Sequence, residues 1–378
     1  MVNLKKEIIL DRLLFLYLIL FPLGQVFHDF YLADIVVAVI GAYTLITQKE
    51  VFEPKGKFLT LLMIGFFSLL FSLSFFSLPE IFLGAAYFTR LVAYVLLFFF
   101  VKARYKSEKD KDILVKSIIA VTFTVTIFGF IQYFFIPDLR ALKVLGWDDH
   151  YFRLVSTFFD PTFTGIVILI GLIISTHKYI QEKKMSYFLI GLLDLIAILL
   201  TYSRSTYVAL IAAFIYLLIL TGKKVVLVFP ILLIAAIPLL PRPSSEGVKL
   251  ERTFSIFQKF ENYGKGIEIS KKSPVFGIGF NNICREKEVS FNESSYLSHS
   301  CSGLDSSVLL ILSTTGVVGL IFFLHVLSQV KRKSLFAVCL VAVLVHSMFT
   351  NTLFYPFVMG LMAIVLAISD ERIYTRPR

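Results

Sequence analysis

The chain has 378 residues, of which 57% are apolar and only 17% charged, against about 45–50% and about 25% in an ordinary soluble domain. This composition excludes a water-soluble globular protein. The net charge of +11 would favour nucleic acid as a partner of a soluble chain, but here the charge is spread between apolar segments, and we expect no nucleic-acid partner. The apolar content is enough for about ten to twelve membrane spans and little else, which predicts an all-α, polytopic membrane protein.

Apolar runs bounded by charged or turn residues predict twelve helical spans. The first run continues for about a full span without a small-residue cleavage site, which favours a membrane helix over a cleavable signal peptide. In chain order the spans are Ile8–Val26, Leu32–Thr47, Phe58–Leu78, Ile81–Val101, Ile113–Phe135, Phe158–Thr176, Met185–Thr201, Ser205–Leu220, Val225–Leu240, Ser306–Val326, Leu335–Phe349 and Leu353–Ser369.

The distribution of Lys and Arg predicts the orientation. The two termini and the loops on their side of the membrane carry 21 Lys and Arg residues, whereas the short loops on the other side carry only Arg140, Lys143, Arg153 and Arg204. By the positive-inside rule, the sequence predicts a multi-pass protein of the cytoplasmic (inner) membrane with cytoplasmic N- and C-termini.

The loops divide the chain into two parts. Residues 1–150 are predicted to be N-terminal transmembrane helices, and residues 151–378 a core that includes one large outer loop, 241–305, between the ninth and tenth spans. Apolar residues at helical spacing predict two short helices in this loop, Val248–Phe260 and Asn262–Ser273. We therefore expect a folded cap over the outer membrane face.

Two of the three cysteines share this loop. Cys284 and Cys301 lie on the predicted outer side, where the environment is oxidising, whereas Cys339 lies in an apolar run. Disulfides form and persist in oxidising compartments. The sequence therefore predicts a disulfide between Cys284 and Cys301.

Few charged groups interrupt the spans, and intramembrane charges usually mark functional interiors. Arg90 lies near the middle of the fourth span, Asp194 in the seventh and His346 in the eleventh. Two interpretations of Arg90 stay open: an interior ion pair that fixes helix packing, with Asp194 as the candidate partner, or a contact with substrate.

Three arginines stand beside the predicted outer ends of helices. Arg204 lies in the tight turn between the seventh and eighth spans, Arg153 precedes Asp160-Pro161 at the mouth of the sixth span, and Arg252 opens the first predicted helix of the outer loop. A guanidinium is a fixed fork of donors that suits phosphate oxygens, so the three together are candidates for a pyrophosphate clamp. Arginines that extend toward lipid headgroups would give the same pattern.

One loop histidine is a candidate base. His299 precedes the tenth span, and an imidazole is the usual proton acceptor near neutral pH; a solvated histidine is the alternative. The chain contains no His-Glu-x-x-His, no Cys-x-x-Cys and no nucleotide-binding glycine motif. We therefore expect neither a metal nor a cofactor.

Four segments follow one another in a recognisable order. They are RLVSTFFDPTFTG (153–165), TYSRS (201–205), SPVFGIGF (273–280) and LLILSTTGVVG (309–319). Their order, spacing and predicted sidedness resemble the O-antigen ligase and O-antigen polymerase family, from about Tyr151 to Asn351. The resemblance implies a bundle of about twelve transmembrane helices with one large outer loop, like the GT-C-type O-antigen ligases.

The resemblance also implies an activity and its partners. Members of this family transfer a glycan from an undecaprenyl-pyrophosphate carrier to an acceptor hydroxyl on the outer face of the cytoplasmic membrane, without a metal. The expected partners are a lipid-linked glycan donor, a glycan, lipid or protein acceptor, and membrane lipids. Arg204 matches the family's arginine in the Ser-Arg turn, and Arg252 is a looser match to arginines of the loop.

The catalytic base is the point of departure from the family. The family's histidine corresponds to Ser306 in this chain. The resemblance therefore leaves three alternatives: His299 acts as the base, Asp305 does, or the acceptor needs no strong base.

A second class of function fits the same composition. A flippase or secondary transporter of lipid-linked glycans would use the interior Arg90, Asp194 and His346. Transporters generally show repeat symmetry and short outer loops, and this sequence shows neither. The sequence therefore favours the enzyme.

Overall fold

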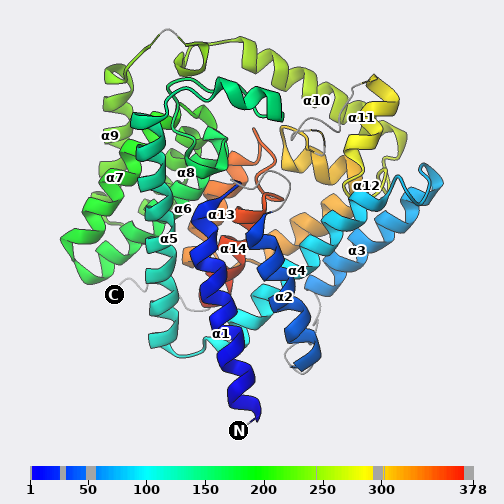
Figure 1. Ribbon diagram of the computed structural model, residues 1–378, viewed down its shortest axis with the longest axis horizontal. Helices are drawn as coiled ribbons and strands as arrows, with labels where there is room; N and C mark the ends of the chain where they lie inside the picture. The colour runs from blue at the N-terminus through cyan, green and yellow to red at the C-terminus, as the bar shows by residue number, and fades with distance from the viewer. Residues whose placement is uncertain are drawn as a thin grey trace.

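The computed structural model describes residues 2–25, 31–47, 57–243, 245–292, 301 and 303–369. Within these ranges the chain is a bundle of α-helices with no β-strand (Figure 1). The helices are α1 (Val2–Leu20), α2 (Leu32–Thr47), α3 (Lys57–Phe71), α4 (Phe82–Arg104), α5 (Glu108–Phe135), α6 (Pro161–Glu182), α7 (Met185–Thr201), α8 (Arg204–Thr221), α9 (Val228–Ala236), α10 (Phe254–Lys272), α11 (Ile283–Phe291), α12 (Ser307–Ser328), α13 (Leu335–His346) and α14 (Pro356–Ile368).

Each predicted span overlaps an α-helix, and the bounds of α2 and α7 are those predicted. The number of spans is a different matter. Among the described residues, five helices are long and apolar enough to cross a membrane, namely α4, α5, α6, α8 and α12, and six further apolar helices are shorter. The 12 residues of α13 extend about 18 Å, less than the hydrocarbon core of about 30 Å. The all-helical fold is confirmed among the described residues, and its five long apolar helices are consistent with a membrane protein. The count of twelve spans and the GT-C-type arrangement stay predictions.

Helix α6 is the centre of the bundle. In its apolar segment 89% of the residues are buried, against 39–44% in the other four long helices. Asp160 caps its first turn by accepting hydrogen bonds from the backbone N–H groups of Thr162 (2.6 Å) and Phe163 (2.9 Å), and Pro161 occupies the first helical position. Both features favour a helix start. The DP motif of the sequence thus fixes the point where the central helix begins.

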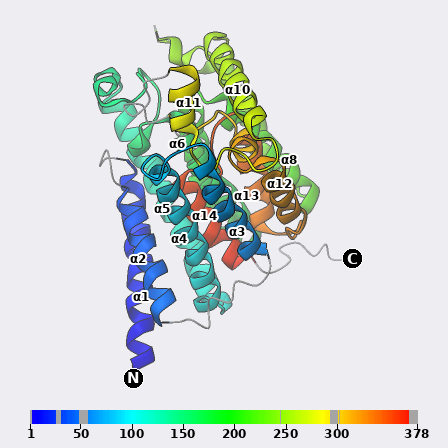
Figure 2. The same ribbon diagram turned by 90° about the vertical axis from the view of Figure 1, so that its right-hand side faces the viewer.

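The large loop predicted to lie on the outer side, residues 241–305, contains helices α10 and α11, which lie at the end of the bundle opposite the N-terminal end of α1 (Figures 1 and 2). The prediction of two short helices over Val248–Phe260 and Asn262–Ser273 was wrong, because α10 is one continuous helix of 19 residues. No proline or glycine lies between these predicted halves, so nothing interrupts the helix there. It ends before Ser273-Pro274, as the sequence predicted.

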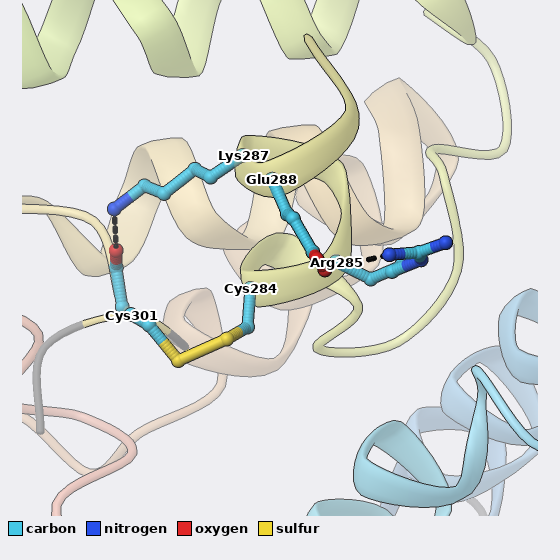
Figure 3. Close-up of a disulfide and its surroundings, with 6 residues drawn as sticks. Cys284, Arg285, Lys287, Glu288 and Cys301 are labelled. Carbon is cyan, nitrogen blue, oxygen red and sulfur yellow. Dashed lines mark hydrogen bonds and ion pairs between the residues drawn. A yellow bond between two sulfur atoms is a disulfide. The ribbon is translucent and has the colours of Figure 1, made fainter. Parts of the chain in front are cut away.

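The disulfide between Cys284 and Cys301 is confirmed, with a Cα–Cα distance of 4.7 Å. It joins the start of α11 to the segment that leads into α12 (Figure 3). The neighbouring Arg285 donates a hydrogen bond to Glu80 (2.8 Å) in the turn between α3 and α4. The disulfide therefore closes a covalent loop within the cap, and the Arg285–Glu80 ion pair joins the cap to the bundle on this side.

Two of the sequence motifs meet inside the bundle. Gly316 interrupts α12 with a φ of 67°, and segment 274–279 lies against this break. A Cβ at Gly316 would lie 2.1 Å from the Val275 carbonyl oxygen, so only glycine permits the approach. The backbone N–H groups donate from Ile278 to Ser313 O (3.0 Å), from Gly279 to Thr314 O (3.1 Å) and from Val317 to Pro274 O (2.9 Å).

Candidate functional site

A cavity of about 950 Å³ opens where the cap meets the bundle. Its wall combines residues of α4 and α10 with residues of several loops. The predicted topology places all of these loops on the same side of the membrane. These loops contribute, in chain order, Gln25, Trp147, Asp305 and Asn351 among others, and α8 contributes its first residue, Arg204. Segments from both halves of the chain therefore form a single cavity.

Four of the five predicted site residues line this cavity: Arg153, Arg204, Arg252 and Asp305. The fifth, His299, lies outside the described residues. One cavity thus has both Arg204 and Asp305 in its wall.

Arg204 connects the bundle to the cap. Tyr202, with a φ of 50°, ends α7, and the Ser203 side chain caps α8, so the turn directs Arg204 toward the loop. One terminal guanidinium nitrogen, Nη1, donates to the carbonyl oxygens of Leu250 (3.1 Å) and Arg252 (3.0 Å), and Nη2 donates to Ser255 Oγ (2.8 Å). Arg204 therefore positions the chain that leads into α10.

Arg153 is almost fully buried, with 8% of its surface exposed. Its Nε donates to the carbonyl oxygen of Thr201 (3.0 Å). Burial, reinforced by the positive charge of Arg252, lowers the pKa of Arg153 to about 10. The side chain thus holds its position through a neutral backbone acceptor.

Arg252 is the third cation of the group. The sequence had predicted that Arg252 opens the first helix of the loop. This prediction was wrong, because Arg252 lies two residues before α10 begins. Its Nη1 donates to the carbonyl oxygens of Gly247 and Lys249, both at 2.8 Å. Burial and the charge of Arg204 lower its pKa.

We call Arg153, Arg204 and Arg252 the arginine cluster. Arg252 interacts electrostatically with both of the others. None of the three forms a salt bridge with a carboxylate in the part of the chain that the structure describes. Their guanidinium groups bond to backbone carbonyls and one hydroxyl, which satisfy N–H donors without neutralising the charge. Such a group favours a multiply charged anion.

Four carboxylates line the same cavity and differ in what they bind. Glu261 forms an ion pair with Lys265 (2.6 Å). Asp160 caps α6. Asp305 forms an ion pair with Lys259 (3.0 Å), and its backbone N–H donates to Asn262 (2.8 Å). Asp148 forms no hydrogen bond or ion pair with another described residue, and burial followed by the repulsion of Asp160 raises its pKa. The raised pKa lets Asp148 accept a proton more readily than an ordinary aspartate does.

Asp148 and Lys259 line the cavity but were not predicted from the sequence. Asp148 lies in GWDDH (146–150), within the second-longest of the loops predicted to lie on the outer side, and that loop length was the available signal. Nothing in the sequence indicated that Lys259 would face Asp305, because the two are 46 positions apart. At the family's histidine position, Ser306 caps α12 by accepting a hydrogen bond from the Leu309 N–H (3.4 Å).

The intramembrane charges pair differently from the prediction. Arg90 forms its ion pair with Asp34 (2.7 Å) and not with Asp194, because Asp194 is buried elsewhere and accepts a hydrogen bond from Thr126 (2.7 Å). His346 is buried and its Nδ1 contacts the Thr352 hydroxyl (2.6 Å). Of the three, only Arg90 lines the cavity.

No group of three or more His, Cys, Asp or Glu side chains in the described ranges is arranged to hold a metal ion. Arginine and lysine side chains line the cavity. The cavity combines a positive region, carboxylates and aromatic rings such as Trp147, Phe159 and Tyr355.

Comparison with known proteins identifies one part of the chain. A search of curated proteins gave no match. The family model described as O-antigen ligase matches residues 188–324, which run from α7 into α12 and include Arg204, Arg252 and Asp305. This match supports a membrane enzyme that transfers glycans in O-antigen assembly. Residues 188–324, about a third of the chain, are thus similar to the O-antigen ligase family.

Proposed function

We propose that this protein transfers a glycan from an undecaprenyl-pyrophosphate carrier to an acceptor hydroxyl on the outer face of the cytoplasmic membrane. The observation that carries the proposal is the arginine cluster, which lines a large cavity and has no salt bridge to a described carboxylate. A pyrophosphate brings the negative charge that this cluster lacks. Whether the acceptor is a core lipid, a protein or another lipid-linked glycan decides between ligase and polymerase.

The cluster supplies the electrostatic part of the mechanism. When the bond between the anomeric carbon and the pyrophosphate oxygen breaks, negative charge develops on the leaving lipid pyrophosphate. Guanidinium groups already fixed by backbone carbonyls stabilise this charge without reorganisation. Arginine charge takes the place that a divalent cation has in many phosphate sites, so we propose a metal-independent reaction.

The acceptor hydroxyl must lose a proton as its oxygen bonds to the anomeric carbon. Asp305 and His299 are the candidates from the sequence, and the structure adds Asp148. Asp305 shares its charge with Lys259 (3.0 Å), whereas Asp148 has no such partner among the described residues. We assign the base to one of the two aspartates, with Asp148 preferred.

The direct test incubates the purified protein, in lipid nanodiscs with a chelator, with an undecaprenyl-pyrophosphate-linked glycan and hydroxyl acceptors. We expect glycan transfer without metal. Replacement of the base by asparagine should lower the rate by about 10²–10⁴, so Asp148→Asn and Asp305→Asn identify it, with Asp149→Asn as the matched control. Absence of transfer to any acceptor class, or transfer only after metal addition, would contradict the proposal.

The orientation is tested separately. We propose that the loop containing α10 faces outward and that Lys331 faces the cytoplasm, as the charge distribution predicts. A membrane-impermeant thiol reagent applied to intact cells should label a cysteine introduced at Glu246 and not one introduced at Lys331. The opposite pattern would invert the topology.

Transport is the weaker alternative. A transporter site was expected around Arg90 and Asp194 at mid-membrane depth, and Asp194 does not line the cavity. No observation on the described residues favours transport over transfer.

A further inference from the structure

A second group of polar side chains lines the cavity: Gln25, Tyr31, Tyr87 and Arg90. Gln25 Nε2 donates to the Tyr31 hydroxyl (2.9 Å). The guanidinium carbon of Arg90 lies 5.3 Å from the centre of the Tyr31 ring and 5.0 Å from that of the Tyr87 ring. The four side chains therefore form one continuous surface, which comes from α4 and from Gln25 and Tyr31, two residues between α1 and α2.

One atom of this group lacks a partner. Gln25 is 5% exposed, and its side-chain oxygen Oε1 is buried without a hydrogen-bond donor among the described residues. Leaving a buried acceptor unsatisfied costs about 1–3 kcal/mol. Because Gln25 lines the cavity, a ligand hydroxyl in the cavity could satisfy this oxygen.

The group has no net charge. Arg90 Nε bonds to Asp34 Oδ2 (2.7 Å), and Tyr94 donates to the other oxygen of the same carboxylate (2.7 Å). The Asp34 charge thus neutralises Arg90, in contrast to the arginine cluster. What remains for a ligand is N–H and O–H donors, one free amide oxygen and two aromatic rings.

These features match a sugar ring. An uncharged pyranose offers hydroxyls that both donate and accept, together with apolar C–H faces that pack on aromatic rings. A phosphate offers acceptors alone, so it leaves Gln25 Oε1 unsatisfied and gains nothing from the rings. We propose that Gln25, Tyr31, Tyr87 and Arg90 form a subsite that binds an uncharged sugar ring of a glycan; we call it the tyrosine subsite.

The inference rests on the proposed function in one respect, since the sugar ring enters the same cavity as the lipid pyrophosphate. The ring belongs either to the donor glycan or to the acceptor glycan. Both sources offer the same chemistry, so the subsite itself does not distinguish them and the experiment must.

The binding test uses the full chain in detergent and a panel of neutral methyl glycosides, those of glucose, galactose, rhamnose and N-acetylglucosamine. Saturation-transfer difference NMR measures the dissociation constant of each. We expect saturable binding of at least one glycoside. Gln25→Leu removes the amide oxygen and should weaken binding by about three- to tenfold, the value of one hydrogen bond. Tyr87→Leu should weaken it similarly through loss of the ring face.

The matched control is Gln258→Leu. Gln258 also lines the cavity, on α10, but its side chain is exposed and lies outside the tyrosine subsite. This variant should bind the glycosides like the wild type. If no glycoside binds, or if Gln25→Leu and Gln258→Leu bind equally well, the inference is wrong.

Inorganic pyrophosphate separates this inference from the proposed function. Its binding should be weakened by Arg252→Gln and unaffected by Gln25→Leu. Pyrophosphate binding without glycoside binding overturns the tyrosine subsite alone. Glycoside binding without pyrophosphate binding overturns the arginine cluster as the pyrophosphate site and leaves the subsite standing.

Transfer kinetics then identify the source of the ring. In the transfer assay, Gln25→Leu should raise the KM of the substrate whose sugar occupies the subsite by about three- to tenfold. A higher KM for the lipid-linked donor assigns the subsite to the donor, and a higher KM for the acceptor assigns it to the acceptor. Unchanged KM values for both would exclude the subsite from the reaction.

Discussion

The arginine cluster and the tyrosine subsite present guanidinium groups to the same cavity, yet they suit different ligands. In the cluster, backbone carbonyls such as Thr201 O and Leu250 O hold the guanidinium groups. In the subsite, the Asp34 carboxylate holds Arg90. A carbonyl satisfies an N–H donor and leaves the positive charge available, whereas a carboxylate also cancels it. The partner behind an arginine thus decides whether its face binds an anion or a neutral polar group.

The largest effect is expected from a substitution that disrupts the arginine cluster. Arg204→Lys keeps the charge and loses the fork that reaches Leu250, Arg252 and Ser255 together. We expect the rate of glycan transfer to fall by about 10²–10³, the effect of removing one stabilising donor, while the protein still folds. Arg140→Lys is the control, because Arg140 is exposed and paired with Asp138 (2.7 Å). Full activity of Arg204→Ala would remove the cluster from the mechanism.

The second prediction concerns the disulfide in the cap, which tests whether the arginine cluster depends on it. Reduction, or Cys284→Ala, should lower the free energy of unfolding by about 3 kcal/mol for a closed loop of this length. Thermal unfolding in detergent with and without a reductant measures the effect. Wild type should become less stable with reductant and Cys284→Ala should not respond. Since Arg204 binds the start of α10 independently, pyrophosphate binding should survive reduction.

Segment 274–279, which packs against Gly316, leads directly into Phe280, an aromatic residue of the cavity wall. Gly316→Ala places a Cβ 2.1 Å from the Val275 carbonyl oxygen at a positive φ. We expect a loss of stability of about 1–3 kcal/mol, measured by thermal unfolding. Gly264→Ala is the matched control, because its Cβ meets nothing within 4 Å in helix α10. That variant should gain about 0.5–1 kcal/mol.

The smallest expected effect concerns His150, which adjoins the cluster. Burial, followed by the charges of Arg153 and Arg252, lowers its pKa to about 3. Below pH 6.5 the unfolded chain binds a proton at this residue and the folded protein does not, so folding stability is lost as the pH falls. At pH 5.5 the loss is about 1.4 kcal/mol.

The measurement is thermal unfolding of wild type and His150→Gln between pH 7.5 and 5.5. The variant should lose less stability than wild type over this range. Equal losses would mean that His150 is accessible to protons and that the cluster tolerates a fourth positive charge beside it.

The sequence located the helices, because apolar runs of span length are determined by local composition. It also predicted the disulfide, since both cysteines stand in one polar loop on the side predicted to be oxidising. The four predicted site residues within the described ranges share one cavity, because each stands beside a helix end on the same predicted side. These inferences needed only the order of residues along the chain.

The tertiary structure alone decided the partners. Asp34 and not Asp194 neutralises Arg90, and Asp148 and Gln25 from the first 150 residues enter a site that the sequence had placed in the second part. Which helix faces meet depends on packing between segments that are distant in sequence, and one-dimensional spacing carries no record of it. The charge of each arginine was fixed by the sequence; whether that charge stays available to a ligand was fixed by the fold.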